Sequence, residues 1–210
     1  MRTKKQNHVL LAENKVANVQ LWGYPNKERG IIEDIELFVE DCSYKPGWVH
    51  LDHPSFPPEI LFEDINNDGS EEIIILLNKG SGSGVSIWEI HVLEESEECG
   101  YSHVFVEDPE SHLHVNMEST IKPHTGRIHY FSKYQTETWD VPFSTGYQEE
   151  HLFDQFVIGS QIHFKVENGN LVAFVGIQLS FLCHIGELQL QYCYKEGKYL
   201  IKTAQLHVWE

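Results

Sequence analysis

The stretch Gln161–Ser180, QIHFKVENGNLVAFVGIQLS, decides the fold class. In its first half, Ile162, Phe164 and Val166 alternate with polar residues, so that one face of an extended chain is apolar. The pair Asn168-Gly169 follows, which is the favoured pair for a type I′ turn, and a second β-rich run comes directly after it. The stretch therefore predicts a β-hairpin with one buried face.

Similar patterns occur on either side of this hairpin. Leu188–Tyr194 alternates and is followed by a turn at Glu196-Gly197, and Ile35–Glu40 alternates as a half-buried strand. The run Ile73–Leu77 is apolar at every position, which indicates a central strand that is covered on both faces. Its expected neighbour, Val85–Glu95, lies across the glycine-rich segment GSGSG.

Helical periodicity is nearly absent, and a short helix is expected only around Tyr147–Phe156. The predicted fold is all-β, with predominantly antiparallel sheets, in the form of a β-sandwich or a partial propeller-like arrangement. No break in composition divides the 210 residues, so residues 1–210 are expected to form a single all-β domain.

The charge of the chain restricts its partners. Thirty-two Asp and Glu against fifteen Lys and Arg give a formal net charge of -17. Such a charge repels phosphate backbones and anionic lipid surfaces, so no nucleic-acid partner is expected. No apolar stretch approaches the roughly 20 residues that span a bilayer, so no membrane insertion is expected and the chain reads as soluble.

The N-terminal residues MRTKKQNHVLLAENK contain no apolar signal-peptide core. The chain as given is therefore expected in the cytoplasm, or outside it if a leader has been removed. The four cysteines form no CxxC pair, which argues against a structural zinc site. The sequence leaves the disulfide state and the oligomeric state open.

The segment Phe62–Leu77, FEDINNDGSEEIIILL, carries the sharpest indication of a site. Oxygen-bearing residues stand at alternate positions with glycine at the sixth, which is the spacing of a calcium loop. The twelfth position is Ile75 rather than a bidentate Glu, so the segment is not an EF-hand. The expected ligands of a weak, structural Ca²⁺ are Asp64, Asn66, Asp68, the Ser70 carbonyl and Glu72.

This D-x-N-x-D-G-x-x-E loop, with a strand directly after it, resembles the calcium loops of FG-GAP and VCBS-type repeats in integrin-like proteins. Those families repeat the loop, and this chain has one copy. Over most of its length the chain is also similar to uncharacterised proteins of Gram-positive bacteria that carry such a loop. The resemblance implies the same ligand positions, but it implies no activity. The alternative is an Asx-rich turn whose side chains cap backbone amides without a metal.

Other candidate sites are less specific. The segment HLHVNME alternates and is predicted to be a strand, so His112, His114, Asn116 and Glu118 are expected to share one face. They could then approach a transition metal, although a solvated polar face is the favoured interpretation. The five tryptophans are expected mainly in the sheet core, with a carbohydrate or peptide groove as the minority view.

No nucleophile motif is present, so the expected function is a non-enzymatic binding or scaffold module with a protein or carbohydrate ligand. The alternative is a hydrolase whose acid, base or metal site is built from scattered carboxylates and histidines.

Overall fold

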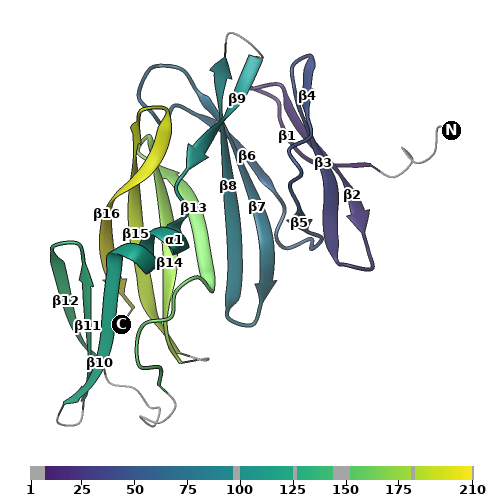
Figure 1. Cartoon of the computed structure of the whole chain (residues 1–210). Helices are drawn as coiled ribbons and strands as arrows, with labels where there is room; N and C mark the ends of the chain where they lie inside the picture. The colour runs from purple at the N-terminus through teal and green to yellow at the C-terminus, as the bar shows by residue number, and fades with distance from the viewer. Residues whose placement is uncertain (1–7, 97–99, 125–126, 144–151, 181–182, 210) are drawn as a thin grey trace.

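A computed structural model of the chain describes residues 8–96, 100–124, 127–143, 152–180 and 183–209. It is 67% strand and 5% helix, with mostly antiparallel sheets, which confirms the predicted β class (Figure 1). The division into domains stays a prediction. None of the described helical segments is long and apolar enough to cross a bilayer.

The described strands form three sheets. The first contains Val9–Asn14 (β1), Val19–Asn26 (β2), Ile31–Val39 (β3), Cys42–Tyr44 (β4) and His50–Leu51 (β5). The second contains Glu59–Glu63 (β6), Glu72–Gly82 (β7), Val85–Ser96 (β8), Gly100–Val106 (β9), Gln161–Glu167 (β13), Asn170–Ser180 (β14), Cys183–Lys195 (β15) and Lys198–Val208 (β16). The third contains Met117–His124 (β10), Arg127–Tyr134 (β11) and Glu137–Phe143 (β12), and Pro109–Asn116 forms the helix α1 before it.

The second sheet curls until it closes on itself. Its strands run in the order β13-β14-β15-β16-β9-β8-β7-β6, and β13 also pairs in parallel with β8. The strand β16 pairs in parallel with β9. Six strands, β8, β9 and β13 to β16, therefore form a ring with an apolar interior, and β7 and β6 extend outward from β8.

The two hydrophobic cores meet at β7. Ile74 and Leu76 point into the core inside the ring, whereas Ile73, Ile75 and Leu77 point into the core shared with the first sheet. The first sheet packs beside β6 to β9 in this way, as Figure 1 shows. The prediction that Ile73–Leu77 is a central strand covered on both faces is confirmed, because these residues are 0 to 5% exposed.

The predicted hairpins are also confirmed. β13 and β14 pair across Asn168-Gly169, with φ values of 53° and 72°, and β15 and β16 pair across Glu196-Gly197, with φ values of 53° and 72°. Both residues of a type I′ turn need positive φ, which Asn and Gly adopt with little strain. The strand β8 follows β7 across the GSGSG segment, as expected.

Two local predictions need correction. The HLHVNME segment does not start as a strand, because residues 112–116 belong to α1 and only 117–118 belong to β10. The Asp108 side chain accepts a hydrogen bond from the Ser111 amide and Pro109 occupies the first turn, so this local cap overrides the alternation of the sequence. The helix expected at 147–156 lies partly outside the described residues, and the described part, 152–156, is not helical.

Candidate functional site

The acidic loop lies between β6 and β7, two neighbouring antiparallel strands. It carries all the predicted ligand residues. Hydrogen bonds join Asn66 to Asp68 and Glu72 and the Ser70 amide to Asp68, whereas the Asp64 carboxylate bonds backbone amides of the loop. Asn67 and Gly69 have φ values of 64° and 94°, so two left-handed residues bend the loop back on itself.

Hydrogen bonds within the loop use most of its side-chain oxygens. The Asp64 carboxylate accepts from the amides of Asn67 (2.7 Å) and Gly69 (3.0 Å), and Asp68 Oδ1 accepts from the Ser70 amide (2.8 Å). The Asn66 Nδ2 group donates to Asp68 Oδ2 (3.0 Å) and to Glu72 Oε1 (2.8 Å). The arrangement is thus a self-closed Asx-rich turn in which one amide group joins two carboxylates.

Glu72 is the buried member of the loop. The residue is 2% exposed, and its Oε2 accepts from the Ile65 amide at 2.8 Å. Burial raises the pKa of the Glu72 carboxyl above its ordinary value; the Ile65 bond opposes this, and Glu94, Asp68 and Asp64 add to the rise. Within the described ranges, no group of three or more His, Cys, Asp or Glu side chains has the spacing of a metal site.

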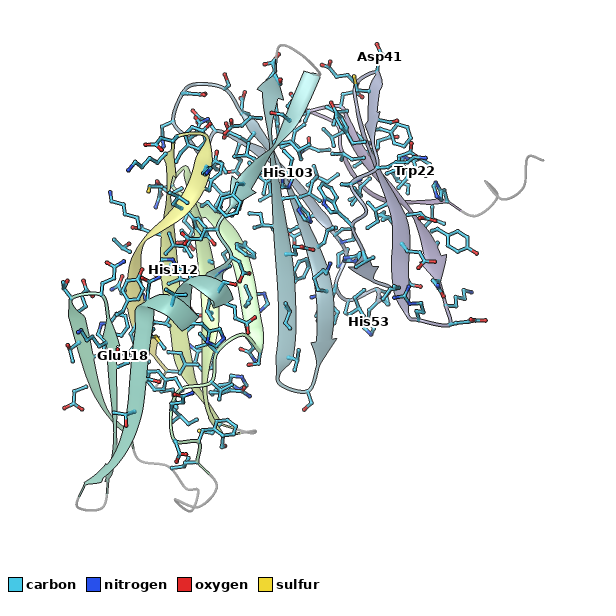
Figure 2. All side chains as sticks on the ribbon, in the orientation of Figure 1. Trp22, Asp41, His53, His103, His112 and Glu118 are labelled. Carbon is cyan, nitrogen blue, oxygen red and sulfur yellow. The ribbon has the colours of Figure 1, made fainter. Side chains whose placement is uncertain are left out.

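His112, His114, Asn116 and Glu118 do not share one strand face. His112 lies buried in α1, the His114 side chain is 63% exposed, and Glu118 lies on β10, as Figure 2 shows for His112 and Glu118.

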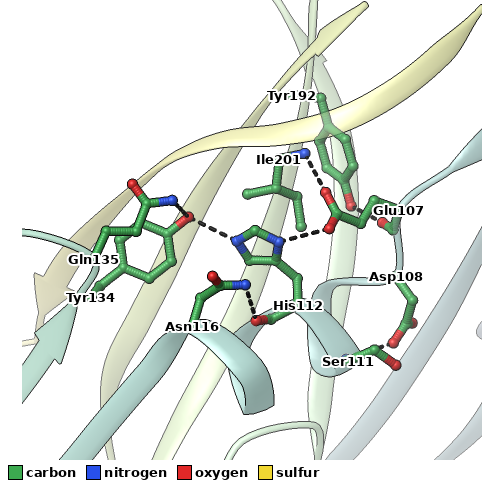
Figure 3. A network of polar contacts seen from close by, with 9 residues as sticks. All are labelled: Glu107, Asp108, Ser111, His112, Asn116, Tyr134, Gln135, Tyr192 and Ile201. Atoms are coloured by element: carbon green, nitrogen blue, oxygen red, sulfur yellow. Dashed lines mark hydrogen bonds and ion pairs between the residues drawn. The ribbon is translucent and has the colours of Figure 1, made fainter. Parts of the chain in front are cut away.

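His112 is instead part of a structural network (Figure 3). Its Nδ1 lies 2.8 Å from Glu107 Oε1 and its Nε2 lies 2.8 Å from the Tyr134 hydroxyl. Glu107 also accepts from the Ile201 amide, and its carbonyl accepts from the Tyr192 hydroxyl. The network ties α1 to β11, β15 and β16, which explains the buried imidazole without a metal.

A groove that sequence reasoning did not locate lies where β9 and β13 separate along β8. Its volume is about 660 Å³. β13 pairs with Ser86 and Ile87, whereas β9 pairs with Val92–Ser96. Between them, residues 88–91 of β8 pair only with β7 among the described strands. The groove is lined by the consecutive residues Ile87–His91. Their side chains alternate between the two faces of the sheet, and a single hollow can reach both faces only at the strand edge.

Four polar side chains that line the groove lie close to one another in a row. Lys79 Nζ lies 2.8 Å from Glu89 Oε2, and the same oxygen lies 3.6 Å from His91 Nε2. His91 Nδ1 lies 3.4 Å from His103 Nε2.

Aromatic stacking holds His91, an inner member of this row of polar side chains. The buried His91 ring stacks on Trp48 with centroids 3.9 Å apart, and His103 follows on β9 (Figure 2). Burial and the neighbouring His91 lower the pKa of His103, so its imidazole is mainly neutral at pH 7.

A second hollow of about 390 Å³ continues the groove across β13. Trp88 and Phe164 line both hollows, so their side chains form the boundary between them. The second hollow is also lined by the charged residues Glu59, Lys165 and Glu187. Of the five tryptophans, Trp88 lines both hollows, and this is the one sequence signal for the site. The strands that frame the groove are far apart along the chain.

No family model, curated protein or solved structure matches this chain. The resemblance to FG-GAP and VCBS-type loops therefore stays a prediction.

Proposed function

We propose that this protein is a non-enzymatic β-rich binding module whose protein or carbohydrate ligand lies in the groove between β9 and β13. The observation that carries the proposal is a hollow of about 660 Å³ that opens onto a strand edge with no partner in the described part of the chain. Ligand pockets fall in the range of about 300–1,000 Å³ and combine apolar walls with a few polar groups. Ile90, Phe105 and Phe164 give this groove its apolar wall. Glu89 and His103 are among its polar groups.

Two exposed phenylalanines allow a matched test. Phe105 lines the groove and is 53% exposed, whereas Phe38 lies on β3 of the first sheet and is 37% exposed. The wild type would be screened against a random-peptide library and an array of oligosaccharides. We expect ligands that bind the wild type and Phe38→Ala but bind Phe105→Ala at least tenfold more weakly. Ligand binding that is insensitive to Phe105→Ala would refute the groove as the site.

We also propose that the loop Asp64–Glu72 holds one structural Ca²⁺, through Asp64, Asn66, Asp68, the Ser70 carbonyl and Glu72. In its support, the Asn66 amide group lies between the carboxylates of Asp68 and Glu72, where a cation would be expected. A turned amide would present its oxygen there, in exchange for the hydrogen bond that Asn66 Oδ1 accepts from the Asp68 amide (2.8 Å), and calcium prefers oxygen ligands. The ion would stabilise the entry into β7.

Calorimetric titration and thermal melting test the calcium proposal. We expect a Kd on the order of 10⁻⁴ to 10⁻³ M, as in extracellular modules. At ten times the Kd, the gain in unfolding free energy would be about 1.4 kcal/mol. The variant carrying Asp64→Ala and Asp68→Ala should show no gain, and a wild type that melts identically in calcium and in chelator would rule the site out.

Hydrolysis is the second candidate function, and the chain from Glu89 through His91 to His103 favours it. A carboxylate 3.6 Å from one imidazole, which in turn lies 3.4 Å from a second, neutral imidazole, is an arrangement that can activate a water molecule. Fluorogenic ester, peptide and glycoside substrates would be tested with the wild type and with His103→Ala. Turnover that His103→Ala abolishes would support this function; no turnover of any of them would dismiss it.

A further inference from the structure

We propose that the occupant of the groove is an extended peptide that adds as a strand to the free edge of β8 and carries Lys or Arg beside apolar side chains. This inference rests on the proposed binding function and specifies its ligand. It follows from three features: the strand edge, the surplus of acidic side chains and the apolar wall.

The strand edge provides backbone recognition. Residues 88–91 of β8 pair with β7 on one side and have no strand partner on the other among the described residues. The NH and CO groups of alternate strand residues point to the same edge, so an extended peptide can pair there. Four residues at about 3.3 Å each span about 13 Å, enough for a short segment between the ends of β9 and β13.

The charges along the two hollows select a cationic ligand. Six carboxylates line them, against two lysines, Lys79 and Lys165. The carboxylates are Glu59, Glu89, Glu107, Asp108, Glu110 and Glu187. Burial lowers the pKa of His103 and of His163, so these two imidazoles add little positive charge at pH 7.

Some of these carboxylates already have partners. Lys79 contacts Glu89, and Glu107 contacts His112 and the Ile201 amide. The Glu110 side chain is 47% exposed and 3.5 Å from His114, so Glu110 is well placed to meet a basic side chain of the ligand. The formal charge of -17 over the whole chain acts in the same direction at longer range.

The wall of the groove favours a peptide over a glycan. None of the described residues that line either hollow is Asn, Gln, Arg, Ser or Thr, so the many hydroxyl groups of a glycan would meet few neutral hydrogen-bonding side chains. Aliphatic and aromatic groups are frequent instead, among them Ile90, Phe105, Val106 and Phe164. Apolar side chains of a peptide strand would pack on them, and alternate residues would meet the carboxylates.

The first test is selection from a random seven-residue peptide library on the immobilised full chain. We expect enriched sequences that combine Lys or Arg with alternating apolar residues, and binding that weakens as salt rises. In fluorescence anisotropy, Glu110→Gln should weaken binding about threefold. Glu28→Gln, an exposed change in the β2–β3 turn, should leave it unchanged. Acidic consensus sequences, or no enriched peptide at all, would overturn the proposal.

The second test examines the strand edge with two N-methylated forms of the best peptide. One form is methylated at odd-numbered amides and the other at even-numbered amides. A strand that pairs on one edge donates only alternate amides to it, so one form should lose at least tenfold in affinity and the other should retain binding. Equal binding of the two forms would contradict strand addition.

The outcomes separate this inference from the proposed function. A glycan that binds the wild type and is lost with Phe105→Ala would keep the groove as the ligand site and refute the peptide. If Phe105→Ala changes the binding of no ligand, both the groove and the peptide are wrong.

Discussion

Glu72 links the acidic loop to the core at the scale of single residues. Its carboxylate is held by the Ile65 amide and by the Asn66 side chain, yet the residue is 2% exposed and other acids lie nearby. A buried carboxylate that is surrounded by like charges disfavours its own ionised form. Glu72 is therefore the member of the loop whose ionised form a bound cation would stabilise most.

Replacing Glu72 with glutamine should separate stability from calcium binding. The folded-state pKa of Glu72 is raised, so its ionised form carries a cost at pH 7 that disappears as the pH falls below about 4.5. In chelator at pH 7, Glu72→Gln should unfold with a free energy equal to or up to about 1 kcal/mol above that of the wild type. The calcium gain should be absent. Urea unfolding measures the unfolding free energy in chelator and its increase on adding calcium. If calcium still increased the unfolding free energy of the variant, Glu72 would be excluded as a ligand.

Glu89 should show the opposite dependence on pH. The neighbouring His91, whose Nε2 lies 3.6 Å from Glu89 Oε2, is the largest cause that lowers the pKa of Glu89 to about 2; burial opposes it and Lys79 supports it. The stabilisation by Glu89 is therefore complete above the ordinary carboxyl pKa of 4.5 and is lost as the pH falls toward 2.

Glu89→Gln tests that dependence. Because the Glu89 side chain is 42% exposed, solvent screens the interaction and the cost at pH 7 should be below about 1 kcal/mol. The unfolding free energies of the variant and the wild type should converge between pH 4.5 and 2. Glu13→Gln, on the exposed strand β1, is the control; a constant difference at all pH values would contradict the assignment.

At the scale of elements, the turns and the helix cap explain which predictions succeeded. The pairs Asn168-Gly169 and Glu196-Gly197 were readable because their positive φ is a local property of those residues. The helix α1 was missed because HLHVNME alternates like a strand. The signal for the helix lay just before it, in Asp108-Pro109, which supplies the cap and the first turn.

Two glycines in strands should respond differently to alanine. A Cβ on Gly186 of β15 would collide with the His207 carbonyl oxygen on β16 and lie 2.9 Å from Val208 Cα, so backbone would have to move. Around Gly80 of β7, a Cβ would meet nothing within 4 Å. We expect Gly186→Ala to lower the unfolding free energy by about 2 kcal/mol or more and Gly80→Ala to change it by less than about 0.5 kcal/mol, as measured by urea unfolding. Equal effects would mean that β15 and β16 are farther apart at this position.

For the whole molecule, β7 decides how the two cores depend on each other. Its side chains alternate between the core inside the ring and the core under the first sheet. Loss of either core would expose one face of the same strand. The two parts are therefore coupled through a shared element rather than through a linker.

The protein should accordingly unfold in one transition. Tryptophan fluorescence, which reports on Trp22 and Trp48 in the first sheet region and on Trp88 in the ring, should give the same urea midpoint as far-UV circular dichroism. Ile74→Ala and Ile75→Ala, one for each core, should each cost about 2–5 kcal/mol and shift both signals together. Two separate midpoints would show that residues 1–210 are not one cooperative domain.

The sequence by itself determined the β class, the hairpins and the doubly covered strand β7, and it placed Asp64, Asn66, Asp68, Ser70 and Glu72 in one loop. Each of these depends on residues that are close in the chain, where side-chain periodicity and turn preferences act. Only the tertiary structure decided the groove, because β13 reaches the edge of β8 from more than seventy residues away and, among the described strands, leaves four residues of that edge unpaired. The alternation within β8 or β13 does not show which distant strand pairs with it, since that pairing depends on how the whole sheet curls.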